Sequence, residues 1–527
     1  MKKLLAIGLT MTVAGSLVAC TSNQQTETGA SQSPSPAPAG AANEDSKKFT
    51  ISTIGGTWAP PVSADGGGLK SINEKFNIDL KPQFVPYAEY SSKLPVVIAG
   101  GDLPDVIGWE NVDASFMKWV KQGAFLPLND YINDYPTLKA VPKNVWDAVT
   151  YNGKIYAIPN YAPAKYGKKT VIRKDWLDNL GLKMPTNYEE LKKVAIAFTR
   201  DDPDKNGKND TYGFGLSQDI TYGAHMGAYW DSGWYHKNEQ GQLIPGTISE
   251  GFKEQTQFLA DLYKEGAIHK DWAVSKVLDV RKDFYAGKFG IWYEQVTGLD
   301  EGAFDTLLKQ SPGAKLEVIP AFKQPDGQQG FLMQSGFYTV TMLNAKLKNE
   351  PDKVKRILGF LDYFRTFIPV DERNPQHADF DWINGGVNKG YKMVNNTVVP
   401  EPFPASDIRP TRYTQIAGWA PSDEATEPWK LYTNPLARSY TQATVEHLKT
   451  TKFYVNPINR ISSEQLMSKG SELNQITRAW QTKMIVGQEP ISSWDKMVDE
   501  FMKKGGKEVI DEVNKRMKET GTTGEWK

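Results

Sequence analysis

The sequence has 527 residues, and its 62 lysine and arginine side chains balance 62 aspartate and glutamate side chains, so the formal charge is zero. This length allows about two to four domains. A hydrophobic content of 39% with 24% charged residues is typical of a folded globular protein and excludes a disordered chain. The balanced charge argues against a nucleic-acid-binding protein, which usually carries a clustered basic excess. The single cysteine excludes an intramolecular disulfide and a cysteine-based zinc site.

The N-terminus has the pattern of a bacterial signal peptide. Lys2 and Lys3 precede an apolar stretch over residues 4–19, which is shorter than the roughly 20 residues that span a bilayer. The only cysteine, Cys20, follows Leu-Val-Ala at the end of this stretch. This ending resembles the bacterial lipobox, in which the cysteine is acylated (palmitate among the acyl chains) and becomes the mature N-terminus. We therefore expect cleavage after residue 19 and a lipid anchor on the extracytoplasmic face of the cell membrane.

Residues 20–46 are expected to be the lipidated cysteine and a disordered tether. The segment is rich in Ser, Thr, Gln, Ala and Pro, so it cannot bury enough apolar surface to fold.

From residue 47 onward, short apolar runs alternate with longer helical patterns, which indicates an α/β chain. Strands are predicted over residues 49–54, around 80–85 and over 106–109. In an open α/β sheet, ligands bind beyond the carboxyl ends of the strands. Trp58 and Trp109 fall at such positions.

Three helices are well marked. The first is predicted to begin at Thr186, which would cap it and form a capping box with Glu189. A second is expected to end near Glu265, before a glycine. A third carries apolar residues at helical spacing over 354–364.

The sequence lacks the short signatures of common catalytic sites. It has no G-x-S-x-G elbow, phosphate-binding loop, dinucleotide fingerprint or H-E-x-x-H motif. None of its five histidines has metal-type spacing.

Five ordered segments resemble the sugar-type extracellular solute-binding proteins, specifically the large lipoproteins that serve ABC importers of oligosaccharides. They read LPVVIAGGDLPDV, GAFLPL, YNGKIYAIP, RKDWLDNLGL with a following PT, and IVG with ISSWD. The segments lie at residues 94–106, 123–128, 151–159, 173–186 and 485–495. The similarity extends over about residues 49–515.

The resemblance implies a two-lobed periplasmic-binding-protein-like α/β fold, in which each lobe is discontinuous in sequence and the ligand lies in the cleft between the lobes. We expect one lobe from residues 47–163 plus about 338–398, and the other from 164–337 plus about 399–527. The crossings would lie near 161–166, near 335–338 and within 399–421. Binding would shift the population toward a closed form.

The implied function is capture of an oligosaccharide and its delivery to an ABC permease, without catalysis. We expect a monomer that contacts the membrane only through its lipid anchor, and the balanced charge indicates that it binds no nucleic acid. A secreted glycoside hydrolase or lyase remains an alternative, because two suitably spaced carboxylates could exist among the 62 acids. A sugar-sensing lipoprotein is a second alternative.

Sugars present apolar C–H faces and many hydroxyls, so their sites combine aromatic platforms with polar side chains. The resemblance points first to Trp292, with Tyr293 and Glu294, and to Trp109. For each tryptophan the alternative is burial in the core. Further candidates, chosen by loop context or by their place near a crossing, are Trp230, Asp231, Trp58, Asn160, Ser335, Trp382, Trp419 and Arg412.

A separate segment, DPDKNGKND over residues 202–210, has the spacing of a calcium loop. The expected ligands of a structural Ca²⁺ are Asp202, Asp204, Asn206, the backbone carbonyl of Lys208, and Asp210. The twelfth position is Gly213 where the full EF-hand has a bidentate glutamate. Members of the resembled subgroup carry calcium in such a shortened loop. The alternative is a solvated Asn-Gly turn.

Overall fold

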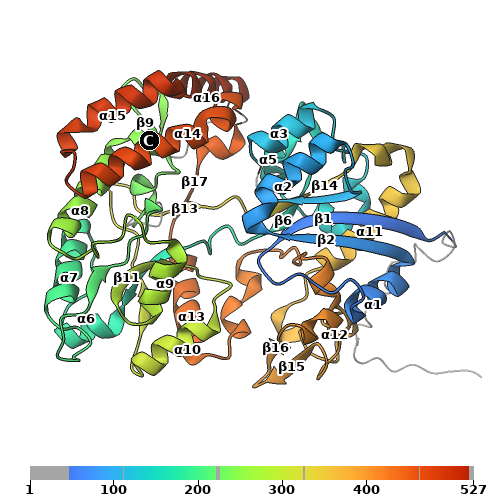
Figure 1. Ribbon diagram of the computed structural model, residues 1–527, viewed down its shortest axis with the longest axis horizontal. Coiled ribbons are helices and arrows are strands. Elements are labelled where there is room, and N and C mark those ends of the chain that lie inside the picture. Colours follow the sequence, from blue (N-terminus) through green and yellow to red (C-terminus); the bar gives the residue numbers. More distant parts are fainter. Residues whose placement is uncertain (1–46, 111, 221–225, 325–326, 462, 522–527) are drawn as a thin grey trace, which may run out of the picture. The chain divides into compact units, whose positions relative to one another are not determined.

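The computed structural model describes residues 47–110, 112–220, 226–324, 327–461 and 463–521. Residues Lys48–Lys527 form one compact unit, organised around two separate sheets with helices packed around each (Figure 1). Within the described ranges, no helix has the length and apolar character needed to cross a membrane. The predicted signal peptide, Cys20 and the tether lie outside the described residues.

The first sheet has five strands, and one of them comes from much later in the sequence. Its spatial order is β2 (Ile78–Pro86), β1 (Phe49–Thr57), β3 (Val106–Trp109), β14 (Phe337–Leu343) and β6 (Ile158–Tyr161). Strand β1 runs parallel to β2 and β3, whereas β14 runs antiparallel to β3 and β6. The helices associated with this sheet are α1 (Gly67–Phe76), α2 (Tyr87–Gly100), α3 (Ala114–Lys121), α4 (Pro136–Lys139), α5 (Lys143–Ala148) and α11 (Pro351–Arg365).

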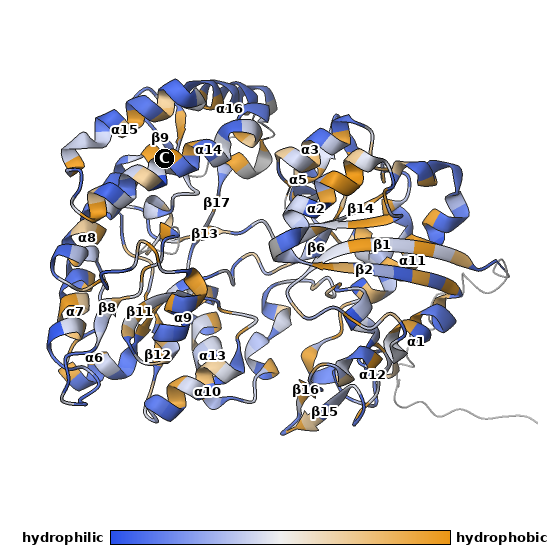
Figure 2. Ribbon diagram, in the orientation of Figure 1, coloured by the Kyte–Doolittle hydropathy of each residue, from blue (hydrophilic) through white to orange (hydrophobic). Residues whose placement is uncertain are grey.

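Apolar side chains from both faces of this sheet form the first core. Ile51 of β1, Ile107 of β3 and Val340 of β14 are fully buried, together with Ile357 of α11. Figure 2 shows hydrophobic residues along β1, β2 and β14. This pattern fits a sheet covered by helices on both sides.

Asp105 joins three segments of the first half that are distant in sequence. Its Oδ2 atom accepts hydrogen bonds from the backbone N–H and the hydroxyl of Ser52, at 2.8 and 2.9 Å. Its Oδ1 atom lies 2.9 Å from Nζ of Lys353 in α11. The carboxylate of the GDLPD turn therefore has a structural role.

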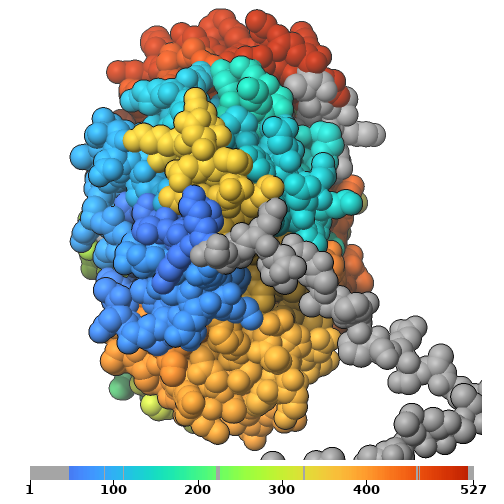
Figure 3. Space-filling model, turned by 90° about the vertical axis from the view of Figure 1, so that its right-hand side faces the viewer, coloured from blue at the N-terminus to red at the C-terminus, as the bar shows by residue number. Residues whose placement is uncertain are grey.

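A later stretch of chain also packs on the first core. Tyr413 and Trp419 are buried there, and the turn η8 (Pro410–Tyr413) contacts α1. Figure 3 shows the N-terminal segments, in blue, beside the later segments in yellow and orange. The same stretch carries α12 (Ala378–Ile383) and a hairpin of β15 (Tyr391–Val394) and β16 (Thr397–Pro400).

The second sheet has four strands, in the order β12 (Leu316–Val318), β7 (Lys169–Arg173), β11 (Phe289–Glu294) and β8 (Tyr212–Phe214). Strand β11 is antiparallel to β7 and parallel to β8. Every residue of β7 is buried, as expected for a strand covered on both faces. The surrounding helices are α6 (Lys174–Leu180), α7 (Tyr188–Arg200), α8 (Glu250–Lys264), α9 (Val277–Tyr285), α10 (Glu301–Gln310) and α13 (Pro435–Thr450).

The C-terminal segment forms a helical layer with its own core. Helices α14 (Glu464–Ile485), α15 (Trp494–Phe501) and α16 (Lys507–Thr520) pack on the pair β9 (Tyr235–Lys237) and β10 (Leu243–Pro245). Trp494 and Phe501 are buried in this cluster. Strand β13 (Phe331–Met333) pairs in parallel with β17 (Phe453–Val455). The remaining short elements are β4 (Thr150–Tyr151), β5 (Lys154–Ile155), η1 (Ile132–Asp134), η3 (Ala228–Trp230), η4 (Gly246–Ile248), η5 (Ala345–Asn349), η6 (Val370–Glu372), η7 (Ala405–Ile408), η9 (Glu424–Thr426), η10 (Pro428–Leu431), η11 (Pro457–Arg460), η12 (Ile491–Ser493) and the π-helical turn η13 (Met502–Gly506).

The segments that connect the two sheets are hydrogen-bonded to one another. The backbone N–H of Ala162 donates to Gly336 at 3.2 Å, and that of Gln334 donates to Ala164 at 2.9 Å. Asp423 accepts from the Tyr161 hydroxyl at 2.8 Å and from the Lys165 backbone N–H at 2.7 Å. Three connections, far apart in sequence, therefore meet at one place.

The predicted elements are largely confirmed, with one shift at a helix start. All three strands are present, and the helices ending near Glu265 and carrying residues 354–364 are α8 and α11. The cap of α7, however, is Asn187, whose side chain accepts from the Glu190 backbone N–H at 2.9 Å. Thr186 instead donates its hydroxyl and backbone N–H to the Glu190 carboxylate. The predicted Thr186–Glu189 box is therefore wrong by one residue, because Asn is at least as good a cap as Thr.

Candidate functional site

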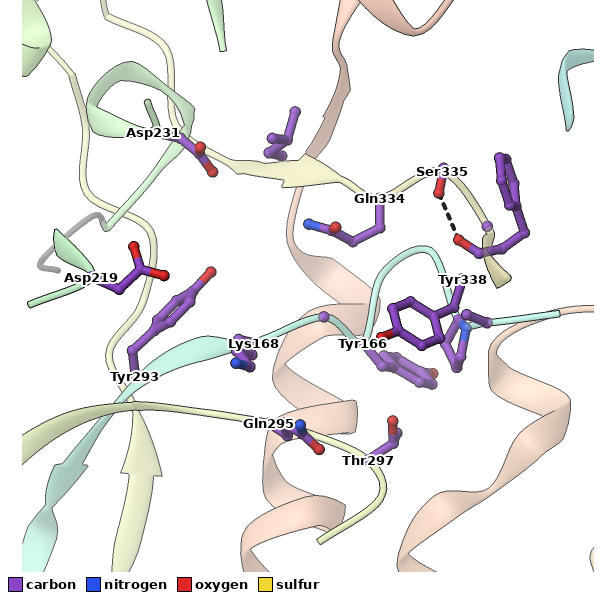
Figure 4. Close-up of a pocket in the computed structure, with 16 residues that line it drawn as sticks. Tyr166, Lys168, Asp219, Asp231, Tyr293, Gln295, Thr297, Gln334, Ser335 and Tyr338 are labelled. Atoms are coloured by element: carbon purple, nitrogen blue, oxygen red, sulfur yellow. Dashed lines mark hydrogen bonds between the residues drawn. The ribbon is translucent and has the colours of Figure 1, made fainter. Parts of the chain in front are cut away.

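A cavity of about 570 Å³ lies where the connecting segments meet. Its walls come from the residues after β6, from the end of β11 and its continuation, and from the residues before β14 (Figure 4). Asp219, Asp231 and Tyr293 lie on one side in this view, with Ser335 and Tyr338 on the other. The described residues that line it are Ala162, Pro163, Tyr166, Gly167, Lys168, Asp219, Asp231, Tyr293, Gln295, Thr297, Leu332, Gln334, Ser335, Gly336, Phe337 and Tyr338.

The lining of this first cavity mixes aromatic rings with hydroxyl, amide and carboxylate groups. Asp219 is held by Arg478 of α14, with the two side chains 3.2 Å apart. The Ser335 hydroxyl donates to the Phe337 carbonyl at 2.8 Å, which fixes the turn before β14. Such a surface suits a ligand with many hydroxyl groups and apolar faces.

Strand β11 places one candidate in the cavity and two in the protein interior. Side chains alternate along a strand, so Tyr293 faces the opposite way from its neighbours. Tyr293 lines the cavity, whereas Trp292 is 1% exposed and packs in a core with Val280 and Tyr440. The prediction that Trp292 stacks on a sugar is therefore wrong, because its indole points to the other face of the sheet.

Glu294 is likewise a structural residue. It is 2% exposed, and its Oε2 atom lies 2.9 Å from Nε of Arg281 and accepts the Tyr285 hydroxyl at 2.9 Å. Its Oε1 atom accepts from the backbone N–H of Gln295 at 2.7 Å. Every oxygen of this buried carboxylate is thus occupied, so the predicted ligand contact of Glu294 is not found.

The residue that follows Lys168 of the cavity lining, Lys169, is a buried lysine. Nζ of Lys169 donates to the backbone carbonyls of Lys165 and Gly167, at 3.2 and 3.0 Å. Burial lowers the pKa of Lys169 to about 7, and the charge of Asp231 opposes this shift. The ammonium group therefore holds the backbone of the connection, and Lys169 is not among the residues that line the cavity.

A second cavity, of about 280 Å³, lies at the first sheet and contains three of the predicted residues, Trp58, Trp109 and Asn160. The Trp58 ring is 75% exposed and lies 4.6 Å from the Tyr87 ring, centroid to centroid. Trp109 contributes a wall but is itself 6% exposed. Nδ2 of Asn160 donates to the Thr339 hydroxyl at 2.9 Å. Tyr338 lines both cavities.

Four other candidates lie elsewhere. Trp230 is buried against the Tyr188 ring, 3.3 Å away between centroids, and donates its indole N–H to Glu254. Trp419 packs on the guanidinium group of Arg365 in the first core.

Trp382 packs with Phe76 and Tyr363, and the Lys75 ammonium lies over its ring. Arg412 donates to the Pro60 carbonyl at 2.9 Å and pairs with Asp407. These two residues, like Trp230 and Trp419, are absent from the described lining of both cavities. Burial of Trp230 and Trp419 contradicts their predicted ligand contacts, whereas the contacts of the half-buried Trp382 and Arg412 stay predictions.

Sequence reasoning missed several lining residues, of which Tyr338, Lys168, Asp219 and Gln334 are examples. Gln334 directly precedes the predicted crossing at 335–338, so a slightly wider window would have included it. Tyr338 lies inside that window but was not selected as a ligand-binding residue. Asp219 has no local signal, because its position depends on tertiary packing against α14.

The 202–210 loop turns its polar groups inward without forming a recognisable metal centre. Asp202 accepts the backbone N–H groups of Asn206 and Gly207, at 3.1 and 2.9 Å. The Asn206 amide donates to Asp204 and Asp210. Burial raises the pKa of Asp204, and the neighbouring acids Asp202 and Asp210 raise it further. In the part of the chain that the structure describes, no group of three or more His, Cys, Asp or Glu side chains is placed to hold a metal ion.

Two sheets joined by several connecting segments, with a polar and aromatic cavity at the junction, define a two-lobed binding protein of the periplasmic-binding-protein-like α/β class. The chain belongs to the bacterial extracellular solute-binding protein family, whose model matches residues 52–365.

Curated relatives and solved structures agree with this assignment. The polygalacturonan/rhamnogalacturonan-binding protein YtcQ of Bacillus subtilis is 29% identical over 98% of this chain and 99% of its own length. Lipoprotein LipO of the same organism is 25% identical over 96% of this chain and 97% of its own length. The structure of Streptococcus pneumoniae FusA in complex with kestose has a TM-score of 0.61 at 20% identity, covering 90% of this chain and 99% of that one.

Proposed function

We propose that the protein is the substrate-binding component of an ABC transporter, which captures an oligosaccharide and delivers it to a membrane permease without chemical conversion. The lining of the first cavity carries this proposal, because rings such as Tyr293 and Tyr338 stand among hydroxyl, amide and carboxylate groups. Two relatives support it, the polygalacturonan/rhamnogalacturonan-binding protein YtcQ and the fructooligosaccharide ABC transporter substrate-binding protein FusA. Hinge closure around the junction would bury the ligand.

Thermal-shift screening of the purified protein against oligosaccharides tests this function. A binding protein is expected to give a concentration-dependent rise in melting temperature with no new reducing ends, because a ligand that binds only the folded state stabilises it. Release of new reducing ends would instead indicate a glycoside hydrolase or lyase. Binding without uptake in a permease-coupled transport assay would favour the sensing alternative.

The proposed division into lobes uses the packing of the two sheets. The first and second crossings are proposed at 161–166 and 335–338, between the strands of different sheets. The buried Tyr413 and Trp419 favour a third crossing after Trp419, and therefore later than residue 399, because both pack in the first core. Limited proteolysis and analytical ultracentrifugation test the division and the proposed monomeric state.

We further propose that a signal peptide is removed after residue 19 and that Cys20 carries the lipid anchor. The name of the relative LipO supports a lipoprotein. Replacing Cys20 with Ser is expected to release the protein from the membrane fraction, because a single residue would carry the acyl chains. A Cys20→Ser variant that fractionates with membranes like the wild type would contradict the anchor.

A structural Ca²⁺ in the 202–210 loop is also proposed. The residue types fit a hard cation, and Oδ1 of Asp204 is buried without a hydrogen-bond partner, although the Asp202 carboxylate is turned toward backbone N–H groups. Two proteins of similar fold have been solved as an alginate-binding protein AlgQ2 without calcium ion and as an EF-hand mutant of FusA. Calcium should raise the melting temperature of chelator-treated protein, and an Asp204→Asn variant should lose this response. If elemental analysis of the protein after incubation with calcium detects no bound calcium, the proposed site is refuted.

A further inference from the structure

The two cavities together form an extended site whose lining contains few cationic side chains. Tyr338 lines both cavities and is 48% exposed, so a ligand passing over its ring would reach from the first cavity into the second. A site of this kind accommodates a chain of sugar rings rather than a single one. The charges that face it determine which sugars it accepts.

Acidic side chains outnumber basic ones in the first cavity. Lys168 is the single lysine or arginine among the described lining residues, against the carboxylates of Asp219 and Asp231. Asp219 pairs with Arg478, and Lys168 and Asp231 line the same cavity, so the lining presents no surplus of positive charge to an anionic ligand. The next residue along the chain, Lys169, is turned away and donates to backbone carbonyls.

The second cavity has no Lys, Arg, His, Asp or Glu among its described lining residues. Carboxylates lie at its border, because the Tyr338 hydroxyl donates to Glu110 and the Tyr161 hydroxyl donates to Asp423. Burial and the nearby Glu110 raise the pKa of Tyr338, so its hydroxyl stays protonated.

Arg365 is a cation that contacts Asn160. Its side chain is 1% exposed, and it donates to the Pro159 carbonyl at 2.8 Å while packing on Trp419. It also lies 3.4 Å from Oδ1 of Asn160, so the amide stands between the guanidinium group and the cavity. Arg365 therefore positions Asn160 and does not present a charge to a ligand.

An oligouronide carries one carboxylate on every ring, and proteins that bind carboxylates line the site with arginine and lysine. Here such a ligand would meet Asp231 and pass close to Glu110, with Lys168 as its one cationic partner among the described lining residues. Like charges at close range disfavour binding. An uncharged oligosaccharide meets hydroxyl and amide groups, and its C–H faces match the exposed ring of Trp58 beside Tyr87.

Resting on the proposed function, we propose that the ligand is an uncharged oligosaccharide that spans both cavities across Tyr338 and stacks on Trp58, and that oligouronides are excluded. This ligand differs from the polygalacturonan and rhamnogalacturonan for which the relative YtcQ is named.

Isothermal titration calorimetry tests the proposal with two ligand sets of matched length, neutral gluco-, galacto-, manno- and fructo-oligosaccharides against oligogalacturonates. At least one neutral set is expected to bind with an affinity that changes little with salt, because few charges are involved. Trp58→Ala should weaken that binding about tenfold without lowering the melting temperature of the free protein. Leu278→Ala is the matched control, since Leu278 is also 75% exposed and lies outside both cavities.

The outcomes separate the two levels of the proposal. Tight, salt-dependent binding of oligogalacturonate that is weakened by Lys168→Gln would overturn the neutral-ligand inference while leaving the proposed function intact. Unchanged neutral-sugar affinity in Trp58→Ala would overturn the stacking contact. Failure of every carbohydrate to bind would overturn both the inference and the proposed function.

Discussion

Exchanging the adjacent residues Trp292 and Tyr293 for alanine, one at a time, should separate stability from binding. Trp292 is 1% exposed and packs against Val280 and Tyr440, whereas Tyr293 is half-buried and lines the first cavity. A buried aromatic ring removes roughly 150–250 Å² from water, which at about 25 cal/mol/Å² corresponds to about 4–6 kcal/mol. Substitutions of this kind cost about 3–5 kcal/mol in practice, so Trp292→Ala should lower the free energy of unfolding by that amount.

Tyr293→Ala should behave in the opposite way. Its ring is partly solvated in the free protein, so the free energy of unfolding should fall by about 1 kcal/mol or less. Oligosaccharide affinity should drop about tenfold or more, because the ring supplies part of the cavity wall. Tyr293→Phe separates ring contact from the hydroxyl contribution.

Urea unfolding followed by circular dichroism measures the first quantity, and calorimetric titration of the same variants measures the second. Circular dichroism is the suitable signal, because it does not depend on the fluorescence of the residue removed. A Tyr293→Ala variant that loses more stability than Trp292→Ala would refute the assigned side-chain directions. So would a Trp292→Ala variant with normal stability and impaired binding.

Three further outcomes are expected. Lys169 has a pKa of about 7 in the folded protein and of about 10.4 in the unfolded chain. At pH values between these two, the Lys169 side chain is protonated in the unfolded chain and neutral in the folded protein. The free energy of unfolding, relative to Lys169→Met, should therefore rise with pH across this window by up to about 1.4 kcal/mol per pH unit, and a flat difference would contradict this. Glu294→Gln should lower the free energy of unfolding, measured in urea, by about 3 kcal/mol, because it removes the buried partner of Arg281, whose side chain is only 23% exposed. A loss below about 1 kcal/mol would instead be typical of a pair at the surface. Asp105→Ala should cost about 2–4 kcal/mol by the same measurement, because Ser52 and Lys353 lose their shared acceptor. Unchanged stability would contradict the structural role assigned to Asp105.

The elements that sequence reasoning predicted well are those with a local signal. Strand β1 and helix α11 are recognisable from the spacing of their apolar residues, and the structure places both as expected. The α7 start was missed by one residue because Thr186 and Asn187 are both acceptable caps, and only the hydrogen bonds distinguish them.

The site was harder to predict because side-chain direction depends on partners far along the chain. Strand β11 is almost entirely buried, so no alternation of polarity shows which of Trp292 and Tyr293 faces the cavity. Trp230 and Trp419 owe their burial to Tyr188 and Arg365, which are distant in sequence. Trp58 and Asn160 were selected because strand ends mark one edge of an α/β sheet, and both line the second cavity.

The position of β14 between β3 and β6 also constrains the order in which the chain can fold. During synthesis the N-terminal residues are made first, so β1, β2 and β3 exist before residues 337–343 have been added. Until then, the hydrogen-bonding groups of β3 that pair with β14 have no partner strand. Exposed strand edges pair readily with other chains, and closing such long loops is slow. The first sheet should therefore complete late, and fragments that end before residue 337 should aggregate rather than accumulate as a folded half.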